Sequence, residues 1–248
     1  MSDVLLLSGG LDSIAAWRLL GCPQAVHFAH GSAAEARERR ALLWAVDQAC
    51  ASWGFDSVQL RGLLLPALDV QDNGYVPYRN AIFCLLAANS FPDATRIIVA
   101  QVAEWAPDKN LRFWRRLTKL MNEMTRSRSN EIDRRVKIVA PFAGLTKGQL
   151  LGRYADEFGL HEANDLIENT WSCYGDGARH CGECSGCLQR AQAERAAFGM
   201  VDFTHYTTFP DVRTHYEERA RQGGIADGWR WLRGNGVLSL VARAREIW

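Results

Sequence analysis

The sequence lacks any long hydrophobic run and carries almost no net charge. Its longest purely apolar stretch covers residues 81–88, far short of the roughly 20 residues that a membrane-spanning helix needs. Lys and Arg number 29 and Asp and Glu 28, which leaves a formal net charge of +1. This balance excludes a surface that attracts nucleic acid or anionic lipid as a whole, although a local patch is compatible with it. The first residues also lack the basic start of a signal peptide, so we expect a cytoplasmic protein with no membrane partner.

The sequence also lacks the cysteine pattern of a secreted disulfide scaffold, which needs an even number of cysteines spread along the chain. The chain has seven cysteines, and four of them fall within residues 173–187. Clustered thiols in a cytoplasmic chain predict a metal site. The other three, Cys22, Cys50 and Cys84, have apolar sequence neighbours and are expected to be ordinary core thiols.

Strand-like and helix-like segments alternate through the first half of the chain. Helical periodicity is present between the apolar runs, and Thr146 and Gln149 form a capping box that predicts a further helix to about residue 158. Near-continuous apolar strands separated by helices predict an α/β fold in which helices flank a parallel, Rossmann-like sheet. The predicted strands are residues 4–7, 25–29, 57–60, 96–102 and 136–140, and the predicted helices are residues 13–20, 33–53, 77–89 and 111–126.

The sequence Ser8-Gly-Gly-Leu-Asp-Ser13 joins the first predicted strand to the first predicted helix. Parallel α/β sheets bind phosphates at this place, because glycines let the backbone approach an anion and the helix N-terminus adds partial positive charge. We expect the Ser8 and Ser13 hydroxyls to donate to phosphate oxygens, and Asp12 to act through a bridging Mg²⁺ or as a cap. The alternative is a glycine-rich turn in which Ser13 is the N-cap. The loop has neither the Walker nor the dinucleotide-binding pattern.

A second motif contains Cys173, Cys181, Cys184 and Cys187, with the spacing Cys-x7-Cys-x2-Cys-x2-Cys. Two-residue gaps let neighbouring thiolates face one ion, and four thiolates form a closed tetrahedral set for a structural Zn²⁺. An iron–sulfur cluster uses the same ligands, so the spacing alone does not distinguish it from zinc. His180 is a weaker candidate for one ligand position.

Composition changes near Asn169, which predicts a boundary. We expect a nucleotide-binding α/β domain over residues 1–168. Residues 169–248 would hold the cysteine motif, a short helix at 188–198 and an aromatic tail. That tail has too many large rings for a disordered linker, so it is expected to pack onto the domain or onto a partner.

Four motifs, in the same order along residues 4–195, carry a family resemblance. The first loop resembles the PP-loop of the ATP pyrophosphatases, which adenylate an acceptor oxygen and release pyrophosphate. The cysteine motif, with Trp171 before it and Arg190 after it, resembles the C-terminal signature of the 7-cyano-7-deazaguanine synthase (QueC) family. Residues 76–80, Val-Pro-Tyr-Arg-Asn, and residues 145–147, Leu-Thr-Lys, resemble two further segments of that family.

The resemblance implies an ATP-dependent C–N ligase of the adenine nucleotide α-hydrolase-like fold, with structural zinc, ATP and Mg²⁺. Such an enzyme adenylates the carboxylate of 7-carboxy-7-deazaguanine. Ammonia then converts it, through the amide, to 7-cyano-7-deazaguanine, a step of queuosine biosynthesis. The resemblance also suggests a homodimer.

The resemblance assigns residues to three roles. Each assignment has an alternative. Arg79, Lys147 and Arg190 could be merely exposed or salt-bridged cations. Asn80 could be a helix cap, and Trp171 could pack around the metal site. The expected nucleotide-binding residues are Leu7, Ser8, Gly9, Gly10, Leu11, Asp12, Ser13 and Ile14. The expected catalytic residues are Asp12, Ser13, Arg79 and Lys147. The expected substrate contacts are Asn80, Glu104, Asp108, Trp171 and Arg190.

Two segments depart from the family pattern. Residues 29–34 read Ala-His-Gly-Ser-Ala-Ala where the family has a Tyr-Gly-Gln-type segment, and residues 104–110 keep only Pro107 and Asp108 of its substrate loop. The second segment follows a predicted strand, where α/β sheets bind ligands, so its changes bear on the acceptor or the base. An alternative is therefore a QueC-like enzyme of an anti-phage defence system that joins a deazaguanine to an amine of a partner protein or to nucleic acid.

Two interpretations from other classes remain. Residues 112–135 contain eight Arg and Lys against three acidic residues, which suits a PP-loop enzyme that modifies tRNA. A solvated helix face explains the same charges, and the near-neutral chain favours it. The other interpretation is a zinc-binding interaction module without catalysis, which an intact loop at residues 8–13 disfavours.

Overall fold

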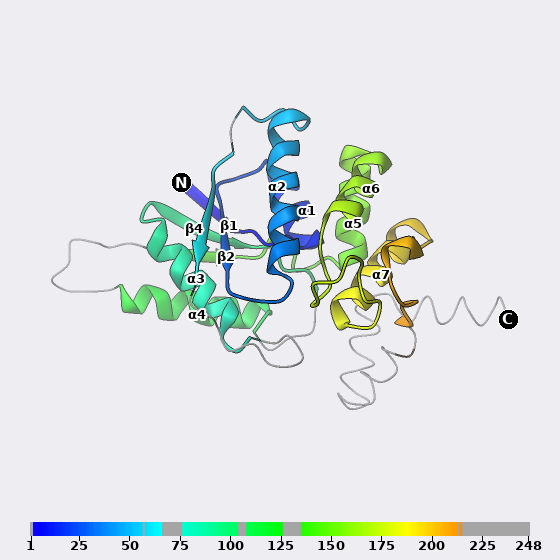
Figure 1. Ribbon diagram of the computed structural model, residues 1–248. Helices are drawn as coiled ribbons and strands as arrows, with labels where there is room; N and C mark the ends of the chain where they lie inside the picture. Colours follow the sequence, from blue (N-terminus) through cyan, green and yellow to red (C-terminus); the bar gives the residue numbers. More distant parts are fainter. Residues whose placement is uncertain are drawn as a thin grey trace.

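The computed structural model describes residues 2–56, 58–65, 76–103, 108–125, 135–212 and 214. Its centre is a five-stranded sheet in the order β3-β2-β1-β4-β5, in which each strand runs parallel to its neighbours (Figure 1). The strands are β1 (Ser2–Leu6), β2 (Ala25–Ala29), β3 (Leu60–Leu64), β4 (Ala94–Val99) and β5 (Lys137–Val139). The parallel α/β sheet predicted from the sequence is confirmed.

Helices connect these strands and follow the last of them. They are α1 (Leu11–Leu19), α2 (Glu35–Ala51), α3 (Arg79–Ser90), α4 (Leu111–Met124), α5 (Lys147–Phe158), α6 (Leu160–Asn169) and α7 (Ser185–Phe198), with a short 3-10 turn, η1 (Phe203–His205). The capping box is present: Thr146 Oγ1 accepts the Gln149 N–H at 3.1 Å, and Gln149 Oε1 accepts the Thr146 N–H at 2.9 Å. Within the described residues, no helix is both long and apolar enough to cross a membrane.

The third strand differs from its prediction. It covers Leu60–Leu64 instead of residues 57–60. As an edge strand it buries little of its surface: Arg61, Gly62 and Leu64 are all exposed. Arg61 and Gly62 also interrupt its leucines, so no continuous apolar run marks where the strand begins.

The sequence also predicts no helix where α6 lies. This helix begins directly after Gly159, whose φ of +95° separates it from α5. Its inward residues, Ala163, Leu166 and Ile167, are too few to give a clear periodicity in a short polar segment. They join the core formed with α1, α2 and α5, so tertiary packing stabilises this helix.

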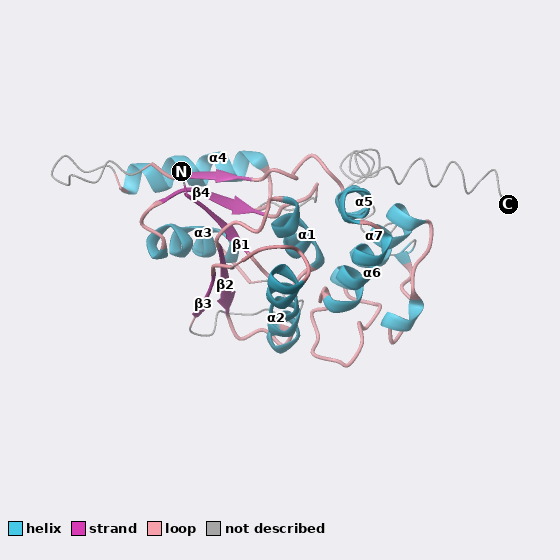
Figure 2. Cartoon of the chain, turned by 90° about the horizontal axis from the view of Figure 1, so that it is seen from above, coloured by secondary structure: helices cyan, strands magenta, loops and turns pink. Residues whose placement is uncertain are grey.

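Each face of the sheet is covered by its own helices. Successive strand residues point to opposite faces. Val4 joins a core formed with α3 and α4, whereas Leu5 joins one formed with α1, α2, α5 and α6. Figure 2 shows α3 and α4 on one side of the sheet and α1 and α2 on the other, with α5, α6 and α7 beyond them. The sheet is thus buried on both faces, as a parallel sheet requires.

The strand order creates a switch point between β1 and β4. From β1 the chain passes through α1 to β2 and β3, and it returns through α3 to β4 on the other side of β1. The loops that follow β1 and β4 diverge there, and open α/β sheets bind ligands in the crevice between such loops. The fold therefore sets the loop at residues 8–13 opposite the loop that contains Asp108.

Candidate active site and metal centre

The loop after β1 is held together by its two serines. Ser13 is 6% exposed, and its hydroxyl lies within donating distance of the carbonyl oxygens of Ser8 and Gly10, at 2.5 and 3.0 Å. The same oxygen accepts the Ser8 N–H at 3.2 Å. Gly10 is the N-cap of α1, so the alternative in which Ser13 caps the helix is wrong. Ser13 thus shapes the loop, while Ser8 is the serine that faces solvent.

The back of this loop is supported by two other segments. A Cβ at Gly9 would collide with the backbone of Glu38 on α2, so only glycine fits there. The Gly9 carbonyl accepts the Trp171 N–H at 2.9 Å. The loop is therefore clamped between α2 and the segment that leads into the cysteine motif.

Asp12 and Lys147 meet beside the loop. Lys147 Nζ lies 2.8 Å from Asp12 Oδ2, and the two side chains are 15% and 19% exposed. Asp12 lies in the first turn of α1, and the capping box starts α5 at Lys147, so two helix N-termini converge here. Helix N-termini favour anions, and a carboxylate oxygen is a ligand that Mg²⁺ prefers. The structure thus brings together two predicted catalytic residues in a setting that suits a phosphate group with its magnesium ion.

The opposite side of the crevice is formed by α3 and the loop after β4. Asn80 Nδ2 donates to Asp108 Oδ2 at 2.7 Å. Arg79 is the first residue of α3 and is half-buried. Tyr78 is the N-cap of this helix, so the alternative in which Asn80 caps it is wrong. Glu104, another predicted substrate contact, lies outside the described residues.

The four cysteines of the motif form one cluster. Their sulfur atoms all lie within 4.8 Å of one another, with 3.4 Å from Cys184 to Cys187, 3.7 Å from Cys181 to Cys187 and 3.9 Å from Cys173 to Cys184. A disulfide needs about 2 Å, whereas sulfurs around a tetrahedral Zn²⁺ lie about 3.8 Å apart, given Zn–S bonds of about 2.3 Å. The donor set therefore fits a four-coordinate metal ion such as zinc.

Hydrogen bonds prepare these sulfurs for a cation. Backbone N–H groups of Gly175 and Cys184 donate to Cys173 Sγ and Cys181 Sγ, each at 3.3 Å. Hydrogen bonds with Cys184 and Cys187 lower the pKa of Cys173 below its ordinary value. Hydrogen bonds with Cys173 and Cys184 raise the pKa of Cys187 above its ordinary value. Thiolates are the metal-binding form of cysteine, so a bound metal ion would displace any proton that these sulfurs hold.

A returning segment closes over the first turn of the motif. Gly182 adopts φ +85°, and a Cβ there would collide with the Thr208 carbonyl. The Thr208 N–H donates to Cys181 O at 3.1 Å, and the Thr207 N–H donates to His180 O at 2.8 Å. The cysteine motif and residues 206–208 thus fold as one unit.

His180 packs beside the cluster without belonging to it. The metal-binding group found among the described residues consists of the four cysteines alone. The His180 ring packs edge-on against Trp171 at 4.4 Å and against Tyr206 at 5.7 Å between ring centres. Burial lowers the pKa of His180 to about 3, so the ring is neutral at ordinary pH. The geometry gives it a packing role in place of the ligand role weighed from the sequence.

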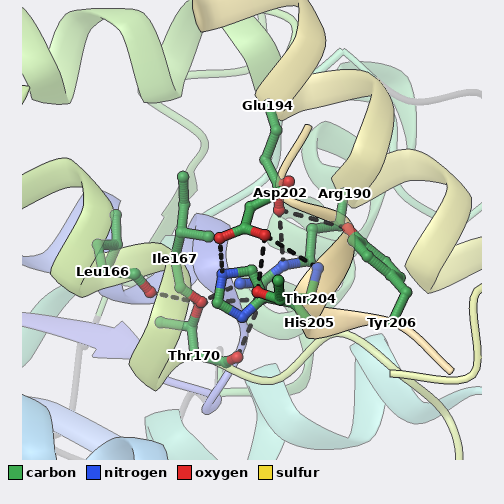
Figure 3. Close-up of polar contacts among 9 residues, drawn as sticks. All are labelled: Leu166, Ile167, Thr170, Arg190, Glu194, Asp202, Thr204, His205 and Tyr206. Carbon is green, nitrogen blue, oxygen red and sulfur yellow. Dashed lines mark hydrogen bonds and ion pairs between the residues drawn. The ribbon is translucent and has the colours of Figure 1, made fainter. Parts of the chain in front are cut away.

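Arg190 lies in the interior instead of facing the crevice. Its side chain is 1% exposed. Nε donates to Glu194 Oε1 at 3.0 Å, Nη1 donates to Thr170 O at 2.9 Å, and Nη2 donates to Ile167 O (Figure 3). Tyr206 completes this group with a hydrogen bond from its hydroxyl to Glu194 Oε1 at 3.3 Å. We therefore replace the predicted substrate contact of Arg190 with a structural role, which is to join α6 and α7.

Trp171 connects the metal centre to the phosphate loop. Its side chain is 9% exposed, and Nε1 donates to Gly175 O at 3.1 Å. The Arg37 guanidinium lies 5.4 Å from the centre of its ring, which also packs against His180. These contacts favour the packing role of Trp171 over stacking on a substrate.

A shallow pocket that was not predicted from the sequence lies at the start of α2. Its volume is about 420 Å³. Glu35 Oε2 accepts the Gly31 N–H at 2.6 Å and holds the turn that forms its rim. The pocket is lined by Gly31, Ser32, Ala33, Glu35, Ala36 and Arg39. The only sequence signal for it is that residues 29–34 depart from the family pattern.

Comparisons with known proteins agree with these motifs. The family model described as Queuosine biosynthesis protein QueC matches residues 66–198, more than half of the chain. A 7-cyano-7-deazaguanine synthase of Chlorobaculum tepidum is 27% identical over 240 residues, which cover 85% of this chain and 99% of the relative. Another, of Thermoplasma acidophilum, is 29% identical over 244 residues, with coverage of 88% and 98%. No solved structure matches the chain.

The residues that the family model matches cover much of the site described above, but not the loop at residues 8–13 with Asp12. They include Asn80 and Asp108 on one side of the crevice, Lys147 on the other, and all four clustered cysteines. The two relatives extend the similarity to most of the chain. The parallel sheet, the loop after β1 and the cysteine cluster are thus those of a member of the QueC family, to which this chain belongs.

Proposed function

We propose that this protein is an ATP-dependent ligase that converts 7-carboxy-7-deazaguanine to 7-cyano-7-deazaguanine. The observation that carries the proposal is the pairing of Asp12 with Lys147, at 2.8 Å, beside the loop after β1. It places a cation and a carboxylate where a parallel sheet binds phosphates. The names of the relatives, all 7-cyano-7-deazaguanine synthases, support the choice of acceptor.

The first chemical step is adenylation of the substrate carboxylate. A carboxylate oxygen attacks the α-phosphorus of ATP, and the bond to pyrophosphate breaks. Backbone N–H groups of the loop and Lys147 Nζ stabilise the negative charge that grows on the leaving pyrophosphate. Asp12 would hold Mg²⁺, which supplies further positive charge at the phosphates. Arg79, at the start of α3, is the proposed cation on the acceptor side.

The second step forms the carbon–nitrogen bond. Ammonia attacks the acyl-adenylate carbonyl, AMP leaves, and the amide results. A second adenylation on the amide oxygen, followed by loss of AMP and protons, gives the nitrile. Asn80 Nδ2 donates to Asp108 Oδ2 at 2.7 Å on the acceptor side of the crevice, and we propose that these two polar side chains bind the heterocycle.

The metal centre serves the same chemistry indirectly. The four cysteines form a closed donor set, with no open position for a substrate in a tetrahedral site. Their segment donates the Trp171 N–H to Gly9 O. We therefore propose that zinc fixes the shape of the phosphate loop and takes no part in the bond changes.

The test is a product assay with purified protein, ATP, Mg²⁺, 7-carboxy-7-deazaguanine and ammonium. We expect AMP, pyrophosphate and the nitrile, identified by mass spectrometry, in a reaction that requires the carboxylate. Absence of carboxylate-dependent AMP would overturn the proposal. AMP formed with the deazaguanine attached to an added protein or to tRNA would favour the conjugating or tRNA-modifying alternatives. Homodimer formation stays a prediction, to be checked by light scattering.

A further inference from the structure

Tyr78 adopts a backbone conformation that tyrosine rarely takes. It is the N-cap of α3, with φ 61° and ψ 0°. Among the described non-glycine residues only Cys22 shares a positive φ, of 49°. For a bulky side chain the left-handed region is a true outlier. Such strain persists only where the surrounding structure imposes it, and it is concentrated at functional sites.

The neighbours of Tyr78 impose this conformation. Val76 is 3% exposed and anchors the chain on one side, while Pro77 has a fixed φ. The Arg79 N–H donates to Val76 O at 3.4 Å, and the Ile82 N–H donates to Tyr78 O at 3.0 Å. These two hydrogen bonds hold the backbone on both sides of Tyr78.

Burial does not compensate for the strain. The Tyr78 side chain is 78% exposed, so it contributes almost nothing to the core. An exposed aromatic ring on a constrained backbone costs little further entropy on contact with a flat ligand, because tyrosine has only two side-chain torsions. A ligand contact therefore explains why a tyrosine occupies a position that suits glycine or asparagine.

The position of Tyr78 in the fold indicates which ligand its ring would contact. Two residues further on, Asn80 Nδ2 donates to Asp108 Oδ2 at 2.7 Å, in the loop that follows β4. The N-terminus of α3 therefore lies at the carboxyl edge of the sheet, on the side of the crevice opposite Asp12 and Lys147. The phosphates belong to the latter side, which leaves the acceptor to the side of Tyr78.

We propose that Tyr78 stacks on the planar heterocycle of the acceptor substrate and that its left-handed backbone directs the ring toward it. This inference rests on the proposed function. Tyr78 is then a specificity-determining residue for a fused aromatic base, and it acts on binding, since its ring carries no proton that the reaction needs. Stacking of a base on an aromatic side chain changes affinity by about tenfold.

The test compares four variants, Y78G, Y78N, Y78L and Y78F. Glycine and asparagine tolerate the left-handed backbone but remove the ring, and phenylalanine keeps the ring without the hydroxyl. We expect Y78G, Y78N and Y78L to raise the KM for 7-carboxy-7-deazaguanine by about tenfold, with kcat and the KM for ATP nearly unchanged, and Y78F to restore wild-type KM. Y78G should also melt about 2–4 °C higher than the wild type, because the strain is released.

The outcomes separate this inference from the proposed function. Calorimetric titration of the wild type and of Y78G with 7-carboxy-7-deazaguanine measures binding without turnover. Weaker binding by Y78G supports the inference even if the wild type forms no nitrile. Equal KM and equal binding in both proteins overturn it and leave the proposed function intact. No binding by the wild type overturns both. A KM defect accompanied by a lower melting temperature in Y78G would show a structural role instead.

Discussion

The phosphate loop and the cysteine centre are neighbours, but they differ in how far they expose their charged side chains to solvent. Beside the loop, the Asp12 and Lys147 side chains keep 19% and 15% of their surface exposed. Behind the cysteines, the Arg190 and Glu194 side chains keep 1% and 3%, and they bind each other. Charge alone therefore does not mark a catalytic residue here. A charged group can serve chemistry only where its polar atoms face the crevice.

The two regions are nevertheless coupled. The hydrogen bond from the Trp171 N–H to Gly9 O joins the segment before Cys173 to the loop itself. A change in the metal centre should thus reach the loop, whereas a change at Lys147 should leave the metal centre intact. Variants in each region test this one-way dependence.

Removal of a cysteine ligand should have the largest effect. In C187A the cluster loses a buried sulfur that lies 3.4 Å from Cys184 and 3.7 Å from Cys181. Structural zinc supplies about 10 kcal/mol or more in small metal domains. We therefore expect loss of bound metal and unfolding of the cysteine segment, measured by elemental analysis and thermal denaturation.

The control for this variant is C50S, which changes a cysteine outside the cluster. The sequence predicts a core thiol at Cys50, but the structure shows it exposed, so that prediction is wrong. C50S should keep full metal content and an unchanged melting curve. Full metal content and an unchanged melting curve in C187A would contradict the prediction that the four cysteines bind a structural metal ion. Elemental analysis of the wild type also separates zinc from the iron of an iron–sulfur cluster.

Loss of Arg190 should have the next largest effect, on stability. R190M leaves Glu194 buried without its partner, and breaking a buried ion pair costs about 3–5 kcal/mol. Urea denaturation should show this loss, while R195M, an exposed arginine on the same helix, should change little. A raised KM with undiminished stability in R190M would instead restore the substrate contact predicted from the sequence.

Loss of Lys147 should act on catalysis and spare the fold. Removal of one group that stabilises transition-state charge typically lowers kcat by about 10²–10³-fold. We expect K147A to show this loss in a pyrophosphate-release assay, with metal content and melting temperature close to those of the wild type. K119A, on α4 with 80% of its side chain exposed, is the matched control. Equal activity in the two variants would contradict the role of Lys147.

Local signals predict the site best. The capping box at Thr146 and Gln149 fixes where α5 begins, and therefore where Lys147 stands. The cysteine spacing predicts the cluster, because all four ligands lie within residues 173–187. Each of these features depends on contacts between residues close in sequence.

Features that depend on distant contacts could not be predicted from the sequence. Arg190 looks like a functional cation because it follows the cysteine motif, but Ile167 and Thr170, from the end of α6 and just beyond it, bury it. The contact between Asn80 and Asp108 spans 28 positions and exists only because the fold brings α3 to the loop after β4. Two predicted segments lie partly outside the described residues: residues 126–134 of the basic segment at 112–135, and residues 213 and 215–248 of the aromatic tail that begins at residue 200.

The smallest expected effect is a pH dependence in the buried pair. Burial raises the pKa of Glu194 above its ordinary value, and this outweighs the opposing effect of Arg190. The folded protein then binds the proton more tightly than the unfolded chain does. Glu194 therefore favours folding most at low pH, and its contribution falls as the pH rises from the unfolded pKa of about 4.3 through the raised native pKa.

The variant E194Q isolates this contribution, because glutamine does not titrate. We expect the stability of the wild type relative to E194Q to decline as the pH rises above about 4.3, the ordinary pKa of glutamate, in urea denaturation curves measured at matched pH. Acid release of the metal affects both proteins and cancels in the difference. An increase with pH would mean that attraction to Arg190 outweighs burial and holds the Glu194 pKa below its ordinary value. In that case Arg190 and Glu194 would form an ion pair as Asp12 and Lys147 do, and the two pairs would differ only in their exposure.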